Sequence, residues 1–192
     1  NKDSTKGLVY VYSGGTLDMY GGTICGGVAK NDNGGGVYVQ AGGKFNMYGG
    51  TITGNIAGKK GSGVYVGTDA NFNMNGGTIS GNKAMENSTS YYAGKGGGVY
   101  VGSGSDCIFT MKNGSIIGNS ATKDGGGVYV TGRFTMSGGT IGGTEESAAN
   151  TASGDGGGVY VYSSSSSYVH ACVMSGNATV TGNKKIDGTA NN

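Results

Sequence analysis

Gly-Gly-Gly-Val-Tyr-Val-Thr-Gly-Arg-Phe-Thr-Met-Ser-Gly-Gly-Thr-Ile, residues 125–141, is the stretch that decides the fold. It contains three short blocks, Gly-Gly-Gly-Val-Tyr-Val, Phe-Thr-Met and Thr-Ile, separated by turn-forming residues. Versions of the three blocks recur in the same order along the chain, at steps of 27 to 35 residues. A repeat of this length is typical of solenoids and related architectures, in which one small unit stacks on the next.

The blocks predict the fold class. Within each block, β-branched and aromatic residues alternate with other residues at the strand period of two, and no helical period is visible. Three short strands per unit, repeated six times, predict an all-β, right-handed parallel β-helix of about six coils. The handedness rests on the general crossover preference of parallel strands. We expect no caps and a single domain over residues 1–192, with repeat units at 7–33, 34–60, 61–95, 96–124, 125–155 and 156–192.

The alternation also predicts which side chains face the core. Phe and Met alternate with polar residues in the second block, so their columns are expected to point inward. The two Val columns of the first block are expected to do the same, which turns the Tyr between them outward. The reverse assignment stays open, although Tyr inside would overfill a narrow core. The predicted outward ladder comprises Tyr10, Tyr38, Tyr65, Tyr100, Tyr129 and Tyr160.

The corners of the coil repeat as well. A Gly follows the third block in every unit, where a positive φ or a close backbone approach is expected: these are Gly26, Gly54, Gly81, Gly118, Gly143 and Gly182. The next column reads Gly27, Asn55, Asn82, Asn119, Thr144 and Asn183. Asn tolerates left-handed backbone and its amide can bond to turn backbone. We therefore expect a structural Asn ladder at Asn55, Asn82, Asn119 and Asn183. An Ala column two residues on should begin a variable loop.

Composition excludes several classes of protein. Gly makes up 45 of 192 residues, but it does not fall at every third position and Pro is absent, so the chain is not collagen. The net charge is +2 without any charge run, so we expect neither nucleic acid nor an anionic membrane as partner. No apolar stretch approaches the length of a membrane span. The opening Asn-Lys-Asp-Ser is not a signal peptide, which suggests a mature or excised piece.

Residues capable of catalysis or metal binding are sparse. Asp124 and Asp155 precede the Gly run in adjacent units, so they are expected side by side, either sharing a cation or forming part of a charged surface column with Lys95 and Lys60. His170 near Cys172 could suggest a base and a nucleophile, but no third orienting group is evident. We therefore predict no catalytic residue, metal, cofactor or enzyme activity.

The three cysteines are not expected to form a disulfide. Cys107 and Cys172 lie two units apart and are expected to be buried and inert, whereas Cys25 is expected to face outward and to be the reactive thiol.

Three surfaces are candidates for binding. Tyr91 and Tyr92 lie in a long loop, where they either contact a sugar or protein or pack locally. The Tyr ladder either binds sugar rings or a neighbouring fibre, or stacks on itself and shields the sheet. Outward Thr-x-Thr arrays, such as Thr51-Ile-Thr53, raise the remote alternative of ice binding, but the second Thr column is irregular.

The repeat also resembles a known group of proteins. The strings Gly-Gly-Gly-Val-Tyr-Val, Phe-Thr-Met-Ser-Gly-Gly-Thr-Ile (134–141) and Gly-Gly-Thr-Ile-Ser-Gly-Asn (76–82) are similar to the right-handed parallel β-helix repeats of large bacterial cell-surface and adhesin-like proteins. The resemblance covers residues 7–183 and includes no catalytic motif. It implies an extracellular stalk or adhesive surface.

These observations together predict a non-enzymatic, extracellular structural or adhesive protein of the cell surface. Its expected partners are further copies stacked end to end in a fibre, or neighbouring repeats of a longer stalk. The alternative to assembly is that the chain is a fragment of a larger protein, with ends chosen for convenience. The alternative function is a β-helix that binds or cleaves polysaccharide, with a glycan as its partner.

Overall fold

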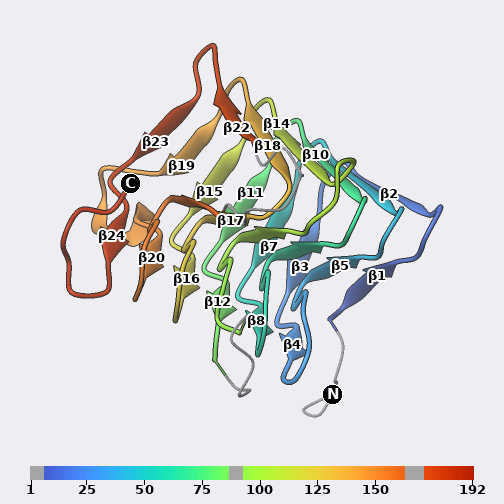
Figure 1. Cartoon of the computed structure of the whole chain (residues 1–192), viewed down its shortest axis with the longest axis horizontal. Helices are drawn as coiled ribbons and strands as arrows, with labels where there is room; N and C mark the ends of the chain where they lie inside the picture. Colours follow the sequence, from blue (N-terminus) through green and yellow to red (C-terminus); the bar gives the residue numbers. More distant parts are fainter. Residues whose placement is uncertain (1–6, 87–92, 163–170) are drawn as a thin grey trace.

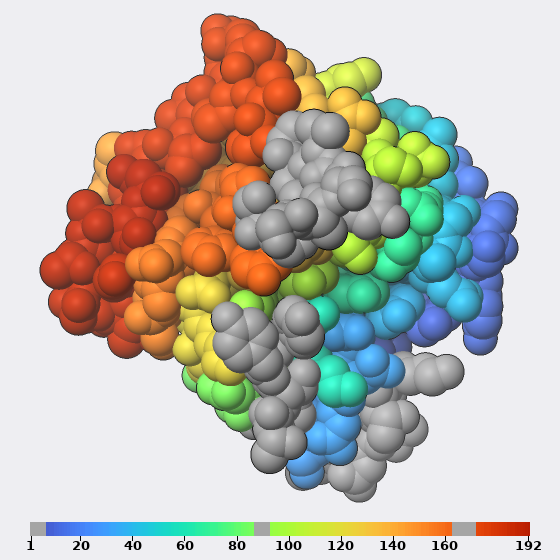
Figure 2. All heavy atoms as spheres, in the orientation of Figure 1, coloured from blue at the N-terminus to red at the C-terminus, as the bar shows by residue number. Residues whose placement is uncertain are grey.

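The computed structural model describes residues 7–86, 93–162 and 171–192. In these residues the chain is all-β, with one short 3-10 helix, η1 (Glu146–Ala148), and no α-helix. The strands form four parallel sheets of six strands each, and strands from successive repeat units are neighbours in every sheet. The protein is therefore a parallel β-helix of six coils. The coils lie side by side from β1 to the β22–β24 end (Figure 1), and form successive colour bands on the surface (Figure 2).

The first three sheets contain the three sequence blocks. The first sheet contains the Val-Tyr-Val strands β1 (Val9–Val11), β5 (Val37–Val39), β9 (Val64–Val66), β13 (Val99–Val101), β17 (Val128–Val130) and β21 (Val159–Val161). The second contains β2 (Thr16–Met19), β6 (Lys44–Met47), β10 (Asn71–Met74), β14 (Ile108–Met111), β18 (Arg133–Met136) and β22 (Ala171–Met174). The third contains β3 (Thr23–Cys25), β7 (Thr51–Thr53), β11 (Thr78–Ser80), β15 (Ser115–Ile117), β19 (Thr140–Gly142) and β23 (Thr179–Thr181).

Each coil also has a fourth strand, which the prediction of three strands per coil misses. The fourth sheet consists of two-residue strands, β4 (Val28–Ala29), β8 (Ile56–Ala57), β12 (Lys83–Ala84), β16 (Ser120–Ala121), β20 (Thr151–Ala152) and β24 (Lys184–Lys185). The Ala column that was expected to begin a loop is the inward face of this sheet, and Ala29, Ala57 and Ala84 are fully buried there. A small side chain lets this short strand lie close to the core at a tight corner.

Inward columns of identical residues build one continuous core. Phe45, Phe72, Phe109 and Phe134 are fully buried, and consecutive rings stack at 4.7–4.8 Å between centroids. This distance equals the spacing of parallel strands, because each ring extends from the same position of the next strand. The Met, Ile and Val columns pack against the Phe stack in the same cluster. The predicted inward faces of the second and third blocks are confirmed.

Glycine is required at two places in the coil. At Gly98, the third Gly of a Gly run, a Cβ atom would lie 2.6 Å from the carbonyl oxygen of Gly127 in the next coil. At the corner after the third strand, Gly54 and Gly81 have φ of 63° and 61°, as expected for that position. In the fifth coil the positive φ belongs to Gly142, and at Gly143, the corner position, a Cβ atom would lie 2.6 Å from Cβ of Ala148.

Candidate functional site

The Asn ladder runs through the stack at the corner between the third and fourth sheets. The backbone N–H and the Nδ2 of Asn55 both donate to Oδ1 of Asn82, at 3.0 and 2.9 Å, and those of Asn82 donate to Asn119 at the same distances. Each Nδ2 also donates to the carbonyl of an Ile at the centre of the third-sheet strand in the preceding coil, as from Asn82 to Ile52 at 3.0 Å. These side chains are buried with their donors satisfied, so their role is to hold adjacent coils in register.

In the fifth coil the ladder residue is Asn150, and the assignment of Thr144 to this column is wrong. Asn119 donates to Oδ1 of Asn150, and Asn150 donates to Oδ1 of Asn183. The inserted residues of this coil, including η1, precede the ladder position instead of following it. The sequence carries the missing signal: Asn150-Thr-Ala152 has the Asn-x-Ala spacing of Asn82-Lys-Ala84.

The Tyr ladder lies on the face of the first sheet opposite the Val columns. Its members pair in register from Tyr10 to Tyr160 along five consecutive strand pairs. The rings of Tyr10 and Tyr38 stack at 4.5 Å, and those of Tyr100 and Tyr129 at 5.2 Å. The stacked rings thus follow the register of the strands, as expected for side chains that all point to the outer face of the sheet.

The middle of this Tyr ladder is not available to a ligand. Tyr100 and Tyr129 are only 4% and 1% exposed, although they point away from the core. Part of their cover comes from two lysines: Nζ of Lys60 lies 4.7 Å from the Tyr100 ring centroid, and Nζ of Lys95 lies 3.2 Å from the Tyr129 hydroxyl. A continuous sugar-binding face along the ladder is therefore not supported by its exposure, and the shielding interpretation fits better.

Burial of the Tyr ladder should appear in its titration. Burial, with the neighbouring Tyr10 second, raises the pKa of Tyr38 from 10.0 to about 12, and burial raises the pKa of Tyr65 and Tyr129 as well. The folded state therefore holds protons that the unfolded state loses near pH 10. The buried, protonated tyrosines therefore contribute to the free energy of unfolding. This contribution is fully present below pH 10 and is lost as the pH rises through about 12.

In a spectrophotometric titration at 295 nm, we expect part of the tyrosinate absorbance to appear only at or above pH 12, together with loss of the far-UV β-sheet signal. Tyr65→Phe should reduce this late component. If all tyrosines ionised near pH 10 while the far-UV spectrum stayed native, the buried ladder would be contradicted.

The two carboxylates before the Gly runs are neighbours, as expected. The backbone N–H of Asp155 donates to Oδ1 of Asp124 at 3.1 Å. Each carboxylate has a lysine partner: Lys95 Nζ lies 3.6 Å from Asp124 Oδ2, and Lys185 Nζ lies 3.3 Å from Asp155 Oδ1. With their charge balanced in this way, the pair fits a charged column of the stack better than a cation site.

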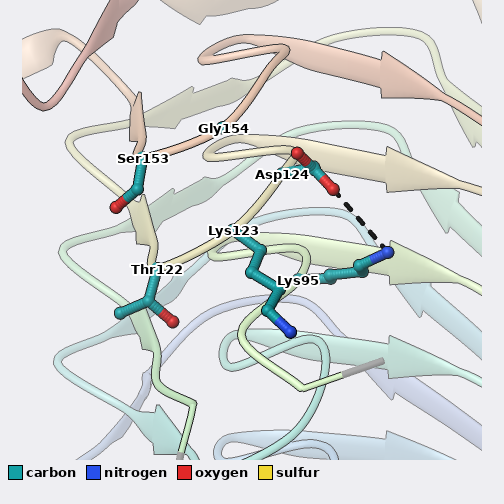
Figure 3. A pocket seen from close by; sticks show the side chains of 6 residues that line it. All are labelled: Lys95, Thr122, Lys123, Asp124, Ser153 and Gly154. Carbon is teal, nitrogen blue, oxygen red and sulfur yellow. Dashed lines mark ion pairs between the residues drawn. The ribbon is translucent and has the colours of Figure 1, made fainter. Parts of the chain in front are cut away.

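A hollow of about 320 Å³ opens beside this charged column (Figure 3). Thr122 and Ser153 lie at one side of it, and Lys95 and Asp124 at the other. On that second side Lys95 is ion-paired to Asp124, and Lys123 pairs with Glu86 at 2.7 Å. Because its charges are already paired, the hollow offers no evident acid and base couple for catalysis. Within the described parts of the chain, no three His, Cys, Asp or Glu side chains gather as metal ligands would.

The three cysteines are all unpaired thiols. Cys25 is exposed and Cys107 is buried, as expected, and burial raises the pKa of Cys107 to about 12. The prediction that Cys172 is buried is wrong. Cys172 does pair in register with Phe134 in the inward column, but it lies in the last coil, and among the described residues no further coil covers it.

Tyr91, Tyr92 and His170 lie outside the described residues, so their predicted roles stay predictions. The second outward column of the third sheet is as irregular as the sequence suggests, since Ile117 and Gly142 interrupt its Thr and Ser residues. In the described residues, no helix has the length and apolar character needed to cross a membrane. No protein-family model, curated protein or solved structure matches this chain.

Proposed function

We propose that this protein is a non-enzymatic structural or adhesive β-helix of the cell exterior, whose stack continues beyond its end coils into a fibre or stalk, either by head-to-tail stacking of copies or through neighbouring repeats of a longer chain. The resemblance to repeats of bacterial cell-surface proteins supports the extracellular role. The repetition itself supports the stacking: five internal junctions use the same register and the same inward columns. A sixth junction with the same inward columns would continue the stack, formed either by a neighbouring repeat of a longer chain or by the first coil of a second copy.

The observation that carries this proposal is the exposure of inward columns at the end of the stack. Val161 is 40% exposed and Met174 is 47% exposed, whereas Val130 and Met136 in the preceding coil are fully buried. Strands β21, β22 and β23 also have a free edge on their outer side within the described residues. Free edges and exposed core residues favour pairing with another strand layer. The contact is heterologous, so it propagates into an open fibre.

A disulfide trap tests the register of this contact. Thr181 ends the third-sheet strand of the last coil, and Cys25 occupies the same position in the first coil. In a head-to-tail junction, these two Cα atoms should lie about one strand spacing apart, roughly 4.8 Å, which a disulfide can span. We expect Thr181→Cys, in a Cys172→Ser background, to give a concentration-dependent ladder of multimers on non-reducing gels.

The matched control is Thr179→Cys, on the same face but two residues earlier, which moves the thiol roughly 6–7 Å along the strand. It should cross-link far less. Equal cross-linking of the two variants would indicate random collision, and no cross-linking at high concentration would reject head-to-tail stacking.

The carbohydrate alternative has one specific observation in its favour. Tyr20 and Tyr48 follow the second-sheet strands of the first two coils, stack at 4.8 Å between centroids, and are 74% and 45% exposed. Exposed aromatic rings of this kind are suited to contact with sugar rings. If the alternative holds, binding on a glycan array should be lost in Tyr20→Ala/Tyr48→Ala and retained in Tyr12→Ala, which removes another exposed Tyr. Absence of binding by the unmodified chain would reject it.

A further inference from the structure

Three asparagines are followed directly by glycine, namely Asn33, Asn75 and Asn113. In such a pair, the backbone nitrogen of the Gly can attack the side-chain amide carbon of the Asn, because the Gly has no Cβ to hinder the approach. In a folded protein, this reaction depends on where the nitrogen lies and on which acceptor its N–H already has. The structure holds the three pairs in three different ways.

Asn113 lies in the turn between β14 and β15 (Figure 1), and its side chain contacts the nitrogen of the next residue. The N–H of Gly114 donates to Oδ1 of Asn113 at 2.8 Å, and among the described residues no backbone carbonyl accepts from it. Asn113 is exposed, and its own N–H makes only a long bond, 3.5 Å, to the carbonyl of Met74. The nitrogen of Gly114 therefore lies next to the Asn113 amide and is not committed to the sheet ladder.

The pair at Asn33 is held away from this reaction. The N–H of Gly34 donates to the carbonyl of Lys60 in the next coil at 3.0 Å, so its nitrogen belongs to the bonding between coils. The Oδ1 atom of Asn33 is also buried. The reaction at Asn33 therefore requires a local opening of the structure first.

The pair at Asn75 is intermediate. The N–H of Asn75 donates to the carbonyl of Met47 at 2.7 Å, a much shorter bond than the one at Asn113. Gly76 is buried, and a Cβ atom there would lie 2.5 Å from the carbonyl oxygen of Tyr48. Within the described parts of the chain, the Asn75 side chain makes no bond to the Gly76 N–H that would bring the two reacting groups together.

We infer that Asn113 is a site of spontaneous covalent modification in the folded protein, at which the side-chain amide is lost as ammonia and aspartate or isoaspartate is formed. The torsion about the Asn Cβ–Cγ bond is soft, so the amide can turn its carbonyl carbon towards the Gly114 nitrogen. This nitrogen gives its proton to hydroxide and forms a new C–N bond to Cγ. The amide nitrogen takes a proton from water and leaves as ammonia, and a second water opens the cyclic imide at either carbonyl. The inference does not depend on stacking.

The turn at Asn113 has room for both products. Aspartate adds a negative charge at an exposed position, and isoaspartate lengthens the main chain by one methylene. The equivalent turn of the sixth coil, residues 175–178, is one residue longer than residues 112–114. The strands on both sides of that longer turn, β22 and β23, still pair in register with β18 and β19. We therefore expect the modified protein to stay folded and to carry one additional negative charge.

The test follows the three sites by mass-spectrometric peptide mapping of the dilute chain, incubated at mildly alkaline pH in buffer and in concentrated urea. In urea, where the fold is absent, the three pairs should lose ammonia at similar rates. In the folded chain, Asn33 should react at least roughly tenfold more slowly than Asn113, a factor that corresponds to about 1.4 kcal/mol. Asn75 should also react more slowly than Asn113.

Two variants assign the product to its site. Asn113→Gly removes the reactive amide and should abolish the acidic form that isoelectric focusing detects in the aged, folded chain. This change is mild, because four other coils have Gly at the same turn position: Gly21, Gly49, Gly76 and Gly138. The matched control, Asn75→Ala, should leave the acidic form in place.

Three results would overturn the inference. They are product at position 113 in urea but not in the folded chain, reaction at Asn33 or Asn75 as fast as at Asn113 in the folded chain, and an acidic form that persists in Asn113→Gly.

Discussion

Phe72→Ala should lower the free energy of unfolding by about 3–5 kcal/mol, the range for truncating a buried Phe. Phe72 is fully buried and its ring stacks between Phe45 and Phe109, at 4.8 and 4.7 Å between centroids. Removal of the ring leaves a gap in the middle of the stack, and the neighbouring coils cannot close it without breaking the register of four sheets. Equilibrium urea unfolding, followed by far-UV circular dichroism, measures the change.

Two controls accompany this prediction. Tyr20→Ala removes a ring of similar size from an exposed position directly after β2, a strand of the sheet that contains Phe72, so it should change the free energy of unfolding by less than about 0.5 kcal/mol. Phe72→Leu keeps most of the apolar volume and should cost clearly less than Phe72→Ala. A cost near zero for Phe72→Ala would mean that the Phe column is not the core.

Asn119→Ala should also cost about 3–5 kcal/mol, for a different physical reason. Oδ1 of Asn119 accepts from both the backbone and the side chain of Asn82, and its own Nδ2 donates to the carbonyls of Ile79 and Ile117. Truncation strands several buried polar groups at once, and each unsatisfied group costs about 1–3 kcal/mol. The same urea unfolding experiment measures the loss.

Asn119→Asp separates hydrogen bonding from packing. The carboxylate keeps the shape and the acceptor for Asn82, but it loses the Nδ2 donors and places a charge in a buried site. It should therefore be at least as destabilising at neutral pH as Asn119→Ala. The exposed Asn113, whose side-chain Oδ1 accepts from the N–H of Gly114 in its own turn, is the control, and its Ala variant should be close to neutral. Equal losses in the free energy of unfolding for Asn113→Ala and Asn119→Ala would contradict the conclusion that the ladder stabilises the stack.

The columns of the core could be predicted because the chain repeats the same residue at the same position. Phe45, Phe72, Phe109 and Phe134 share one phase of a period of two, and stacking identical units leaves no choice of register. The ladder positions Asn55, Asn82, Asn119 and Asn183 can be predicted for the same reason. In the fifth coil the distance from the corner Gly predicts Thr144 instead, because an insertion there places the ladder residue, Asn150, six residues later. The Asn-x-Ala spacing would have identified Asn150.

The short fourth-sheet strands and the exposure of individual side chains could not be predicted from the repeat pattern. Two-residue strands such as Val28–Ala29 are too short to show an alternation, so the fourth sheet was read as the start of a loop. Alternation predicts which face a side chain takes, but exposure depends on what lies over that face. Tyr129 points outward and is buried, whereas Cys172 belongs to an inward column and is exposed because it lies in the last coil.

Cryo-electron microscopy of the concentrated chain tests the central claim, stacking of coil ends, most directly. The account predicts unbranched filaments with a layer spacing of roughly 4.8 Å along the axis and one molecule per six layers, a rise of roughly 29 Å. Single particles at every concentration, or filaments whose strands run along the axis instead of across it, would contradict it.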